Sequence, residues 1–402
     1  MIIENKLNGL LLTTFPFMTP RHGGQIRMSK TFKYLNEHGH NLISIAFYEP
    51  GVYSKSTISK NDIALPYDNK WMSFCGFNSA LINDHITGEY VYDRRDFYFN
   101  LIKNKLPKHL DYIYVEHPWL FKFGKFIQKK LNQEVKFFLG YPNVESILKQ
   151  SILDSYKIKG YDEIISNIHF LEIEAIKNSD LVFIVSKKEK IFCKKYTKIN
   201  KLIYSRNGYE PLKPICENSL KKLKKKLPEK FIFYIGSGHP PNFSNLCDFL
   251  GDALGFLPPD VKFVVAGGVS DHVYSAFTKD ENFLINQSRL LLLGDISEVD
   301  LNTIRQLAHI IVLPIGYGGG SALKTSEALS SKCYVVSNDV GLRDFEQFID
   351  NNKVYLCNDK DSFTSTIAKL LLKNRCTQKA PVELSWDNQM KIVDENIKRY
   401  LK

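Results

Sequence analysis

The chain has 402 residues, of which 44% are hydrophobic and 24% charged, a composition that predicts a soluble globular protein of two or three domains. Its formal net charge of +11 favours acidic partners such as nucleotides or anionic lipid head groups. The seven cysteines form no CxxC pair, which argues against a zinc site, and no apolar run approaches the ~20 residues needed to span a bilayer.

The first half of the chain alternates strand and helix patterns. Asn8 to Thr14 predicts a strand, a loop rich in proline and glycine follows, and Gln25 to His38 has the apolar spacing of a helix. Gly23 and Gly24 lie at the end of this loop, where they either let the backbone approach a phosphate or an acceptor or form a plain turn. Residues 50–110 show no clear period. Further strands are predicted at 40–47, 111–116, 135–139, 181–185 and 201–205, and a long helix at 160–178.

The pattern restarts after Asn207-Gly208. Residues 211–230 are polar and basic and predict a linker or an exposed helix, and a second series of strands alternating with helices begins at Phe231. Strands that alternate with helices in both halves predict two parallel-sheet domains. The last predicted element is an amphipathic helix over Trp386 to Leu401.

The stretch from Ala308 to Asn338 predicts a strand, a glycine loop, a helix and a second strand. A glycine loop that leads into a helix N-terminus is a ready anion site, because free backbone N–H groups and the helix dipole point the same way. The glycines that allow this close approach are Gly316, Gly318, Gly319 and Gly320.

The helix after this loop carries charged residues on one face. Ser321 can cap its N-terminus, and Lys324 and Glu327 are three residues apart, so both project from the same side. One cation and one carboxylate beside a phosphate-sized loop suit a nucleotide diphosphate with its ribose. The alternative is an ordinary strand–helix–strand unit with a solvated lysine–glutamate pair.

Several short motifs follow one another in the order and spacing of a known enzyme family. Together they resemble the retaining, nucleotide-sugar-dependent glycosyltransferases of family 4, also called glycosyl transferases group 1. The motifs are Gly23-Gly24 with Arg27, His38-Gly39-His40, Asn143-Val144-Glu145, Glu174 with Asp180 to Ser186, Arg206-Asn207-Gly208, Tyr234 to Asn242, and Gly319 to Glu327.

The resemblance covers nearly the whole chain and implies an α/β fold of the GT-B class, with two Rossmann-like parallel-sheet domains facing a cleft. It implies an acceptor-side domain over 1–205, a nucleotide-sugar donor domain over 206–384, and a C-terminal helix over 385–402 that crosses back to the first domain. The activity that it implies is transfer of a sugar from a UDP- or GDP-linked donor to a glycan or lipid-linked acceptor, with retention, in surface polysaccharide synthesis.

The resemblance also implies which residues form the site. His117 follows a strand where the family has a histidine near the donor sugar; the alternative is a loop histidine bonded to backbone. Lys324 is expected beside the leaving diphosphate, which makes these two the candidate catalytic residues. The donor site is expected to contain Gly236, Asn242, Gly318, Gly319, Gly320, Ser321, Lys324 and Glu327, and the acceptor or phosphate loop is expected to contain Gly23, Gly24 and Arg27.

No metal and no other cofactor are expected, because cations and helix N-termini can stabilise a leaving diphosphate without Mg²⁺. Asp359-Lys360-Asp361 has the form of a DxD metal motif. It precedes a predicted helix, however, and is better explained as the N-cap of that helix.

Two alternatives to a transferase stay open. The first is a nucleotide-sugar 2-epimerase of the same fold. The second is a non-catalytic partner that binds a glycan or a true transferase, which Gly319 supports because the family has a glutamate there. The expected location is the cytoplasm, or the inner face of the membrane, where the lysine-rich stretches 187–201 and 221–230 would meet anionic lipid. No nucleic-acid partner is expected, since no recognition motif accompanies the charge.

Overall fold

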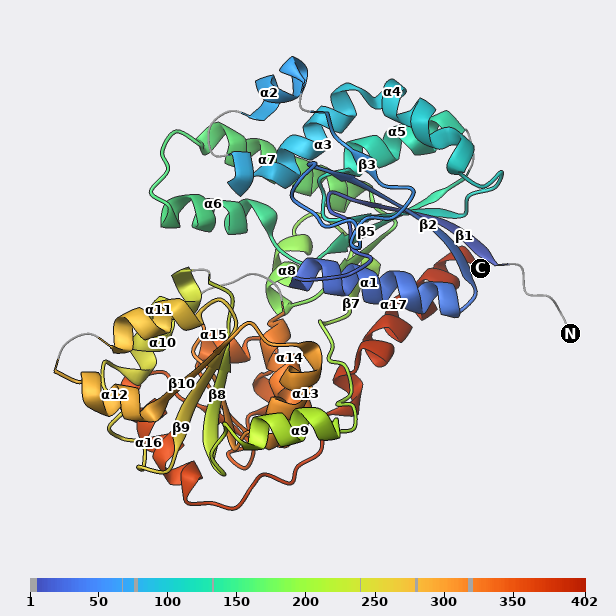
Figure 1. Cartoon of the computed structure of the whole chain (residues 1–402). Helices are drawn as coiled ribbons and strands as arrows, with labels where there is room; N and C mark the ends of the chain where they lie inside the picture. The colour runs from blue at the N-terminus through green and yellow to red at the C-terminus, as the bar shows by residue number, and fades with distance from the viewer. Residues whose placement is uncertain are drawn as a thin grey trace, which may run out of the picture. The chain divides into compact units, whose positions relative to one another are not determined.

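The computed structural model describes residues 6–66, 68–75, 79–131, 134–238, 240–278, 281–316 and 321–402 (Figure 1). Contacts divide the chain into two compact units. The first contains the chain up to Asn207 together with Trp386–Lys402, and the second contains most of the chain from Gly208 to Ser385. Each unit is built on its own parallel sheet, which confirms the predicted class of two parallel α/β domains.

The first domain has a seven-stranded sheet in the order β3-β2-β1-β4-β5-β6-β7, and every pair in it is parallel. The central strands are almost wholly buried because helices cover both faces, and so they are apolar runs rather than alternating ones. The strands are β1 (Leu7–Thr13), β2 (His40–Tyr48), β3 (Ile63–Ala64), β4 (Tyr112–Glu116), β5 (Lys136–Tyr141), β6 (Leu181–Ile184) and β7 (Leu202–Tyr204).

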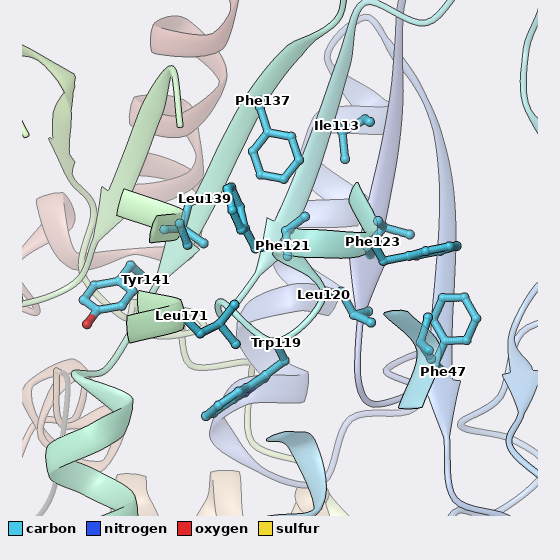
Figure 2. Packing of buried hydrophobic residues seen from close by; sticks show 14 of the residues in the cluster. Phe47, Ile113, Trp119, Leu120, Phe121, Phe123, Phe137, Leu139, Tyr141 and Leu171 are labelled. Atoms are coloured by element: carbon cyan, nitrogen blue, oxygen red, sulfur yellow. The ribbon is translucent and has the colours of Figure 1, made fainter. Parts of the chain in front are cut away.

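Aromatic side chains fill the core of this domain on the face covered by α3, α5 and α7. Figure 2 shows Phe47, Phe121, Phe123 and Phe137 around the central strands, with Trp119 at the end of β4. The helices are α1 (Gly23–Glu37), α2 (Asn69–Cys75), α3 (Asn83–Asp93), α4 (Arg95–Ile102), α5 (Phe121–Leu131), α6 (Glu145–Ser155), α7 (Asp162–Asn178) and α8 (Lys187–Cys193), joined by the C-terminal α17 (Trp386–Leu401).

Two sequence expectations for the first domain need correction. Residues 50–110, which show no period in the sequence, contain β3 and the three helices α2 to α4. Gly23 and Gly24 are the first two residues of α1 rather than part of a loop, and no side chain caps that helix. The helix begins at Gly23 because the backbone is still extended at His22, the residue before it.

The second domain has a six-stranded parallel sheet in the order β10-β9-β8-β11-β12-β13. The strands are β8 (Phe231–Ile235), β9 (Lys262–Ala266), β10 (Leu290–Gly294), β11 (Ile310–Leu313), β12 (Tyr334–Ser337) and β13 (Val354–Leu356). The helices are α9 (Glu217–Lys224), α10 (Pro240–Leu250), α11 (Ser270–Phe277), α12 (Phe283–Arg289), α13 (Glu298–Leu307), α14 (Leu323–Ser330), α15 (Asp339–Leu342) and α16 (Lys360–Leu371).

The helix starts of the second domain test the caps that the sequence predicted. The first helix after β8, α10, begins at Pro240, a residue type well suited to a first helical turn. Ser321 does not cap α14, whose N-cap residue is Ala322. Asp359 does cap α16, through a bond from Ser362 N to Asp359 Oδ1 of 2.8 Å, so the capping interpretation of the DxD-like segment is confirmed.

No helix in the described part of the chain combines the length and the apolar character that crossing a membrane requires. The aromatic and lysine-rich segment after Trp119 forms α5, which buries Phe121, Phe123 and Ile127 in the core and carries its lysines on the other face.

The C-terminal helix α17 is held in the first domain by a buried polar contact. Asp394 Oδ1 lies 2.7 Å from His40 Nε2, and the other ring nitrogen of His40 lies 2.7 Å from the hydroxyl of Tyr112 on β4. Lys398 Nζ donates to Asp394 Oδ2 over 2.9 Å. The carboxylate therefore joins α17 to the first residue of β2 and, through His40, to the first residue of β4.

Replacing Asp394 with alanine should lower the free energy of unfolding by about 1–3 kcal/mol, because it leaves a buried imidazole nitrogen without its partner. The matched control is Glu395→Ala, whose side chain is 53% exposed and whose loss should change stability by less than about 0.5 kcal/mol. Urea denaturation followed by circular dichroism measures both, and equal effects would show that the His40 contact does not hold α17.

Candidate active site

The polar residues of the first domain gather where β1, β4 and β5 end. His117 follows β4 directly and has a φ of 60°, a left-handed conformation that is uncommon for a residue with a side chain. Its backbone N–H donates to the carbonyl of Gly140 over 2.9 Å. Its Nδ1 lies 2.6 Å from Glu145 Oε1. The ring is thus oriented by a carboxylate, and backbone strain at such a position is typical of a functional site.

The position of Glu145 depends on a second buried carboxylate. Glu172, on α7, accepts hydrogen bonds from the backbone N–H groups of Glu145 and Ser146 at the start of α6, and from the hydroxyl of Tyr141 over 2.6 Å. Burial, with a smaller contribution from the neighbouring Glu145, raises the pKa of Glu172 to about 7, although the hydrogen bonds from Ser146 and Tyr141 oppose this shift. The carboxylate therefore caps α6 from another helix and fixes the residue that orients His117.

The imidazole of His117 favours its protonated form. Burial alone would lower its pKa, but the adjacent Glu145 carboxylate, with smaller contributions from Glu116 and Asp84, raises the pKa above the usual value of 6.5. Phe15 packs edge-on against the ring, with 6.0 Å between ring centres. His117 is therefore held by a carboxylate side chain and an aromatic ring, and it is not a loop histidine bonded only to backbone.

A second ion pair lies beside this histidine. Lys149 Nζ donates to Asp84 Oδ2 over 3.4 Å, and Thr14 donates to the other oxygen of Asp84 over 2.6 Å. The ammonium lies 5.7 Å from the centre of the Trp119 ring, so Lys149 also makes a cation–π contact. No sequence motif points to Asp84 or Lys149, because they lie on α3 and α6, far apart in the chain.

Arg27 occupies a different environment from the one expected. Its side chain is 2% exposed, and Nη1 donates to the carbonyl of Arg206 over 3.2 Å. Its Nε lies 3.9 Å from Glu116 Oε1, and burial raises the pKa of this glutamate. A Cβ at Gly140 would overlap the Glu116 carboxylate, so glycine is required there. Arg27 is thus buried beside a buried carboxylate, and its predicted place in an acceptor or phosphate loop stays a prediction.

The second domain places Lys324 in the first turn of α14. Lys324 Nζ donates to Asn242 Oδ1 over 2.9 Å and lies 5.4 Å from the centre of the Tyr234 ring. Burial lowers the pKa of Lys324 to about 8, although Glu327 partly opposes this shift. Lys324 and Asn242, two of the predicted donor residues, are therefore in direct contact. Because its pKa is about 8, the lysine changes its protonation state near neutral pH.

Glu327 has a partner that the sequence did not reveal. Arg305 Nη2, from α13, donates to Glu327 Oε2 over 2.5 Å. Burial raises the pKa of Glu327, while Arg305 and Lys324 lower it. Glu327 and Lys324 are not directly bonded in the structure, so the solvated lysine–glutamate pair is not what forms. Among the described residues, only Oε2 of this carboxylate has a hydrogen-bond donor, Arg305.

The structure describes only two of the remaining predicted donor residues, Gly236 and Ser321. Gly236 packs closely against Gly267, because a Cβ at Gly267 would overlap the Gly236 carbonyl oxygen. Ser321 is buried, and its Oγ has no hydrogen-bond partner in the described part of the chain. Gly318, Gly319 and Gly320 lie outside the described residues, so the predicted diphosphate loop stays a prediction.

Comparison with known proteins bears on the second domain most directly. Residues 229–373, which include Lys324, Glu327, Asn242 and Gly236, match the family model described as glycosyl transferases group 1. This segment belongs to that family. The chain is a glycosyltransferase, as the sequence motifs predicted, and the matched segment spans the sheet and most of the helices of the second domain.

Solved structures show the same fold over nearly the whole chain, although they are too distant in sequence to show more. Sucrose-phosphate synthase from Thermosynechococcus elongatus is 13% identical, with a TM-score of 0.64 over 99% of this chain and 95% of its own. An α,α-trehalose-phosphate synthase (UDP-forming) from Burkholderia xenovorans, solved with glucose-6-phosphate, is 14% identical, with a TM-score of 0.65 over 98% and 100%. A UDP-N-acetylglucosamine 2-epimerase is 14% identical, with a TM-score of 0.56 over 98% and 97%. No curated protein matches the chain in sequence.

Replacing Glu145 with glutamine should lower the pKa of His117, because the carboxylate that stabilises the imidazolium is lost. The folded-state pKa of His117 is raised, so the pair stabilises the wild type fully below the unfolded pKa of 6.5 and loses this effect as pH rises through the folded value. NMR titration of the His117 ring protons and urea denaturation at pH 5.5 and 8.5 measure the two effects. An unchanged titration in Glu145→Gln would refute the electrostatic role of Glu145.

Proposed function

We propose that this glycosyltransferase moves a sugar from a nucleotide-sugar donor, linked to UDP or GDP, to a glycan or lipid-linked acceptor, with retention of configuration, in surface polysaccharide synthesis. The observation that carries the proposal is the half-buried Lys324 at the start of α14, within the segment that matches the transferase family. A partly desolvated cation with a lowered pKa is poised to gain a proton and charge when an anion binds beside it.

In this proposal the donor diphosphate lies beside Lys324 and the glycine loop before α14, and the ribose hydroxyls bond to the free oxygen of Glu327. Arg305 holds the other oxygen, so the carboxylate stays ionised and correctly oriented for the sugar. Charge on the leaving phosphate grows in the transition state, and Lys324 therefore accelerates departure more than it strengthens ground-state binding.

In this proposal, His117 binds the donor sugar. Its imidazolium, held by Glu145, donates a hydrogen bond from Nε2 to a hydroxyl of the donor sugar and so fixes the ring for transfer. The neighbouring Asp84 and Lys149 present an acceptor and a donor of hydrogen bonds, which suit the hydroxyl groups of a glycan acceptor. Gly23 and Gly24 leave free N–H groups at the start of α1 that suit the same ligands.

Lys324→Met should weaken the binding of UDP or GDP and abolish the proton uptake that accompanies it. Since the pKa of Lys324 is about 8, an adjacent diphosphate raises this pKa, and wild-type affinity should fall as pH rises from 7 to 9. Calorimetry in two buffers of different ionisation enthalpy measures affinity and proton uptake together. The control is Lys332→Met at an exposed position near the same helix. A Lys324 variant that binds with wild-type affinity and proton uptake would place the donor site elsewhere.

Transfer should proceed in EDTA, because Lys324 and helix N-termini supply the positive charge that Mg²⁺ would otherwise provide. Incubation of the enzyme with UDP- and GDP-sugars and a panel of glycan acceptors, followed by NMR of the product anomer, measures both transfer and stereochemistry. An α-linked donor should give an α-linked product. Complete loss of activity in EDTA with recovery in Mn²⁺ would refute the metal-free mechanism, and an epimerised nucleotide sugar formed without acceptor would identify a 2-epimerase.

A further inference from the structure

A separate polar cavity lies on the helical face of the first domain, away from the ends of the strands. It has a volume of about 300 Å³ and lies between three helices that cover the same face of the sheet, α3, α5 and α7 (Figure 1). This is the lower end of the range of about 300–1,000 Å³ that is usual for ligand pockets. Its lining includes His85, Glu89, Lys122, Asn167, Phe170 and Glu174.

The polar groups of this cavity can both donate and accept hydrogen bonds. Lys122 Nζ donates to Glu89 Oε1 over 2.9 Å, which fixes one ammonium and one carboxylate on one wall. Asn167 and Glu174, both exposed on α7, add an amide and a second carboxylate on the other wall. Donors and acceptors that converge from three helices suit a ligand with several hydroxyl groups.

An aromatic ring lies at the rim of the same cavity. Phe170 is 68% exposed, although it is one of the largest apolar side chains of the domain. Because Asn167, Phe170 and Glu174 are spaced by three and four residues, they share one face of α7. An exposed aromatic face beside polar side chains matches a sugar ring, which has an apolar face of C–H groups and a rim of hydroxyls.

The charge of the cavity argues against an anionic ligand. One lysine faces two glutamates, and burial lowers the pKa of His85 although Glu89 raises it, so this imidazole is neutral at pH 7. The lining therefore carries a net charge of about −1, which disfavours phosphates and nucleotides and leaves a neutral polyhydroxyl ligand as the best fit.

The cavity is connected to the candidate active site of the same domain through Trp119. The Trp119 ring meets His85 edge-on, with 6.1 Å between ring centres, and Lys149 Nζ lies 5.7 Å from the same ring. His85 also follows Asp84 in sequence, so neighbouring residues at the start of α3 belong to the two places. A glycan bound at Asp84 and Lys149 is thus one aromatic side chain away from the cavity.

We propose that this cavity is a second carbohydrate-binding site, which takes a neutral sugar unit of a glycan by stacking on Phe170 and by hydrogen bonds to Asn167, Glu174 and the Glu89–Lys122 pair. Its role as a contact for the distal part of a glycan acceptor rests on the proposed transferase function. The binding itself does not, because it needs neither the nucleotide nor the second domain.

Saturation-transfer difference NMR on the full chain tests the site directly. The probes are the neutral disaccharides maltose, cellobiose, lactose and N,N′-diacetylchitobiose, with glucose 6-phosphate as an anionic probe. At least one neutral disaccharide should give a signal that falls at least fivefold in Phe170→Ala and in Asn167→Ala. The matched control is Phe97→Ala, which removes another exposed phenylalanine, 60% exposed on α4 of the same domain, and should leave the signal unchanged.

Three results would overturn the proposal: no signal from any neutral disaccharide, a signal that survives Phe170→Ala, or preferential binding of glucose 6-phosphate. UDP binding, measured in the same samples, separates this proposal from the proposed function. Sugar binding that is retained in a protein that binds no nucleotide would support the site and refute the donor assignment. Sugar binding that is absent in a protein with normal UDP binding and transfer would refute the second carbohydrate site and leave the donor assignment standing.

Discussion

The buried carboxylate of Glu172 is the contact on which the order of the first domain's site depends. Glu172 lies on α7, but it accepts hydrogen bonds from the first N–H groups of α6. It also accepts a hydrogen bond from the hydroxyl of Tyr141 at the end of β5. These bonds fix Glu145 in space, and Glu145 then fixes the ring of His117. An ionised carboxylate accepts stronger hydrogen bonds than a neutral one. Because burial raises the pKa of Glu172 to about 7, the bonds that it accepts from α6 reach their full strength only above neutral pH.

A second buried charged pair, Arg27 and Glu116, lies at the end of β4, next to His117. Arg27 and Glu116 lie deep in the domain at 3.9 Å, and several of their polar atoms have no direct hydrogen-bond partner among the described residues. Loss of one member of such a pair leaves the other buried and uncompensated, at a cost of about 3–5 kcal/mol. Gly140 provides the space for the carboxylate, and Arg27 also holds the carbonyl of Arg206, near the point where the chain passes to the second unit. Arg27 therefore contributes to the geometry around His117 without being exposed to a ligand.

In the second domain, the charged residues of the candidate site are paired differently. Its key cation, Lys324, is held by a neutral amide and an aromatic ring rather than by a carboxylate, and Glu327 is satisfied by Arg305 instead. Lys324 consequently carries an incompletely compensated charge in a half-buried place, and this desolvation lowers its pKa to about 8. A group in this state gains most from an anionic ligand, whereas a lysine already paired with Glu327 would gain little. In the proposed donor site, this separation would let two residues three apart on one helix contact different parts of one ligand.

The sequence by itself determined the class of fold, because apolar strands that alternate with amphipathic helices in both halves have few solutions other than two parallel sheets. It also determined which segment carries the transferase family's residues, since the motif around Lys324 and Glu327 is local. Only the tertiary structure decided the partners of these residues. Arg305 and Glu327 come from the successive helices α13 and α14, and Lys149 and Asp84 from helices far apart in the chain, and no local period links either pair. The burial of Arg27 and the capping of α6 by Glu172 were equally invisible in the sequence, because a charged residue beside a glycine pair or in an amphipathic helix is expected at the surface until packing places it inside.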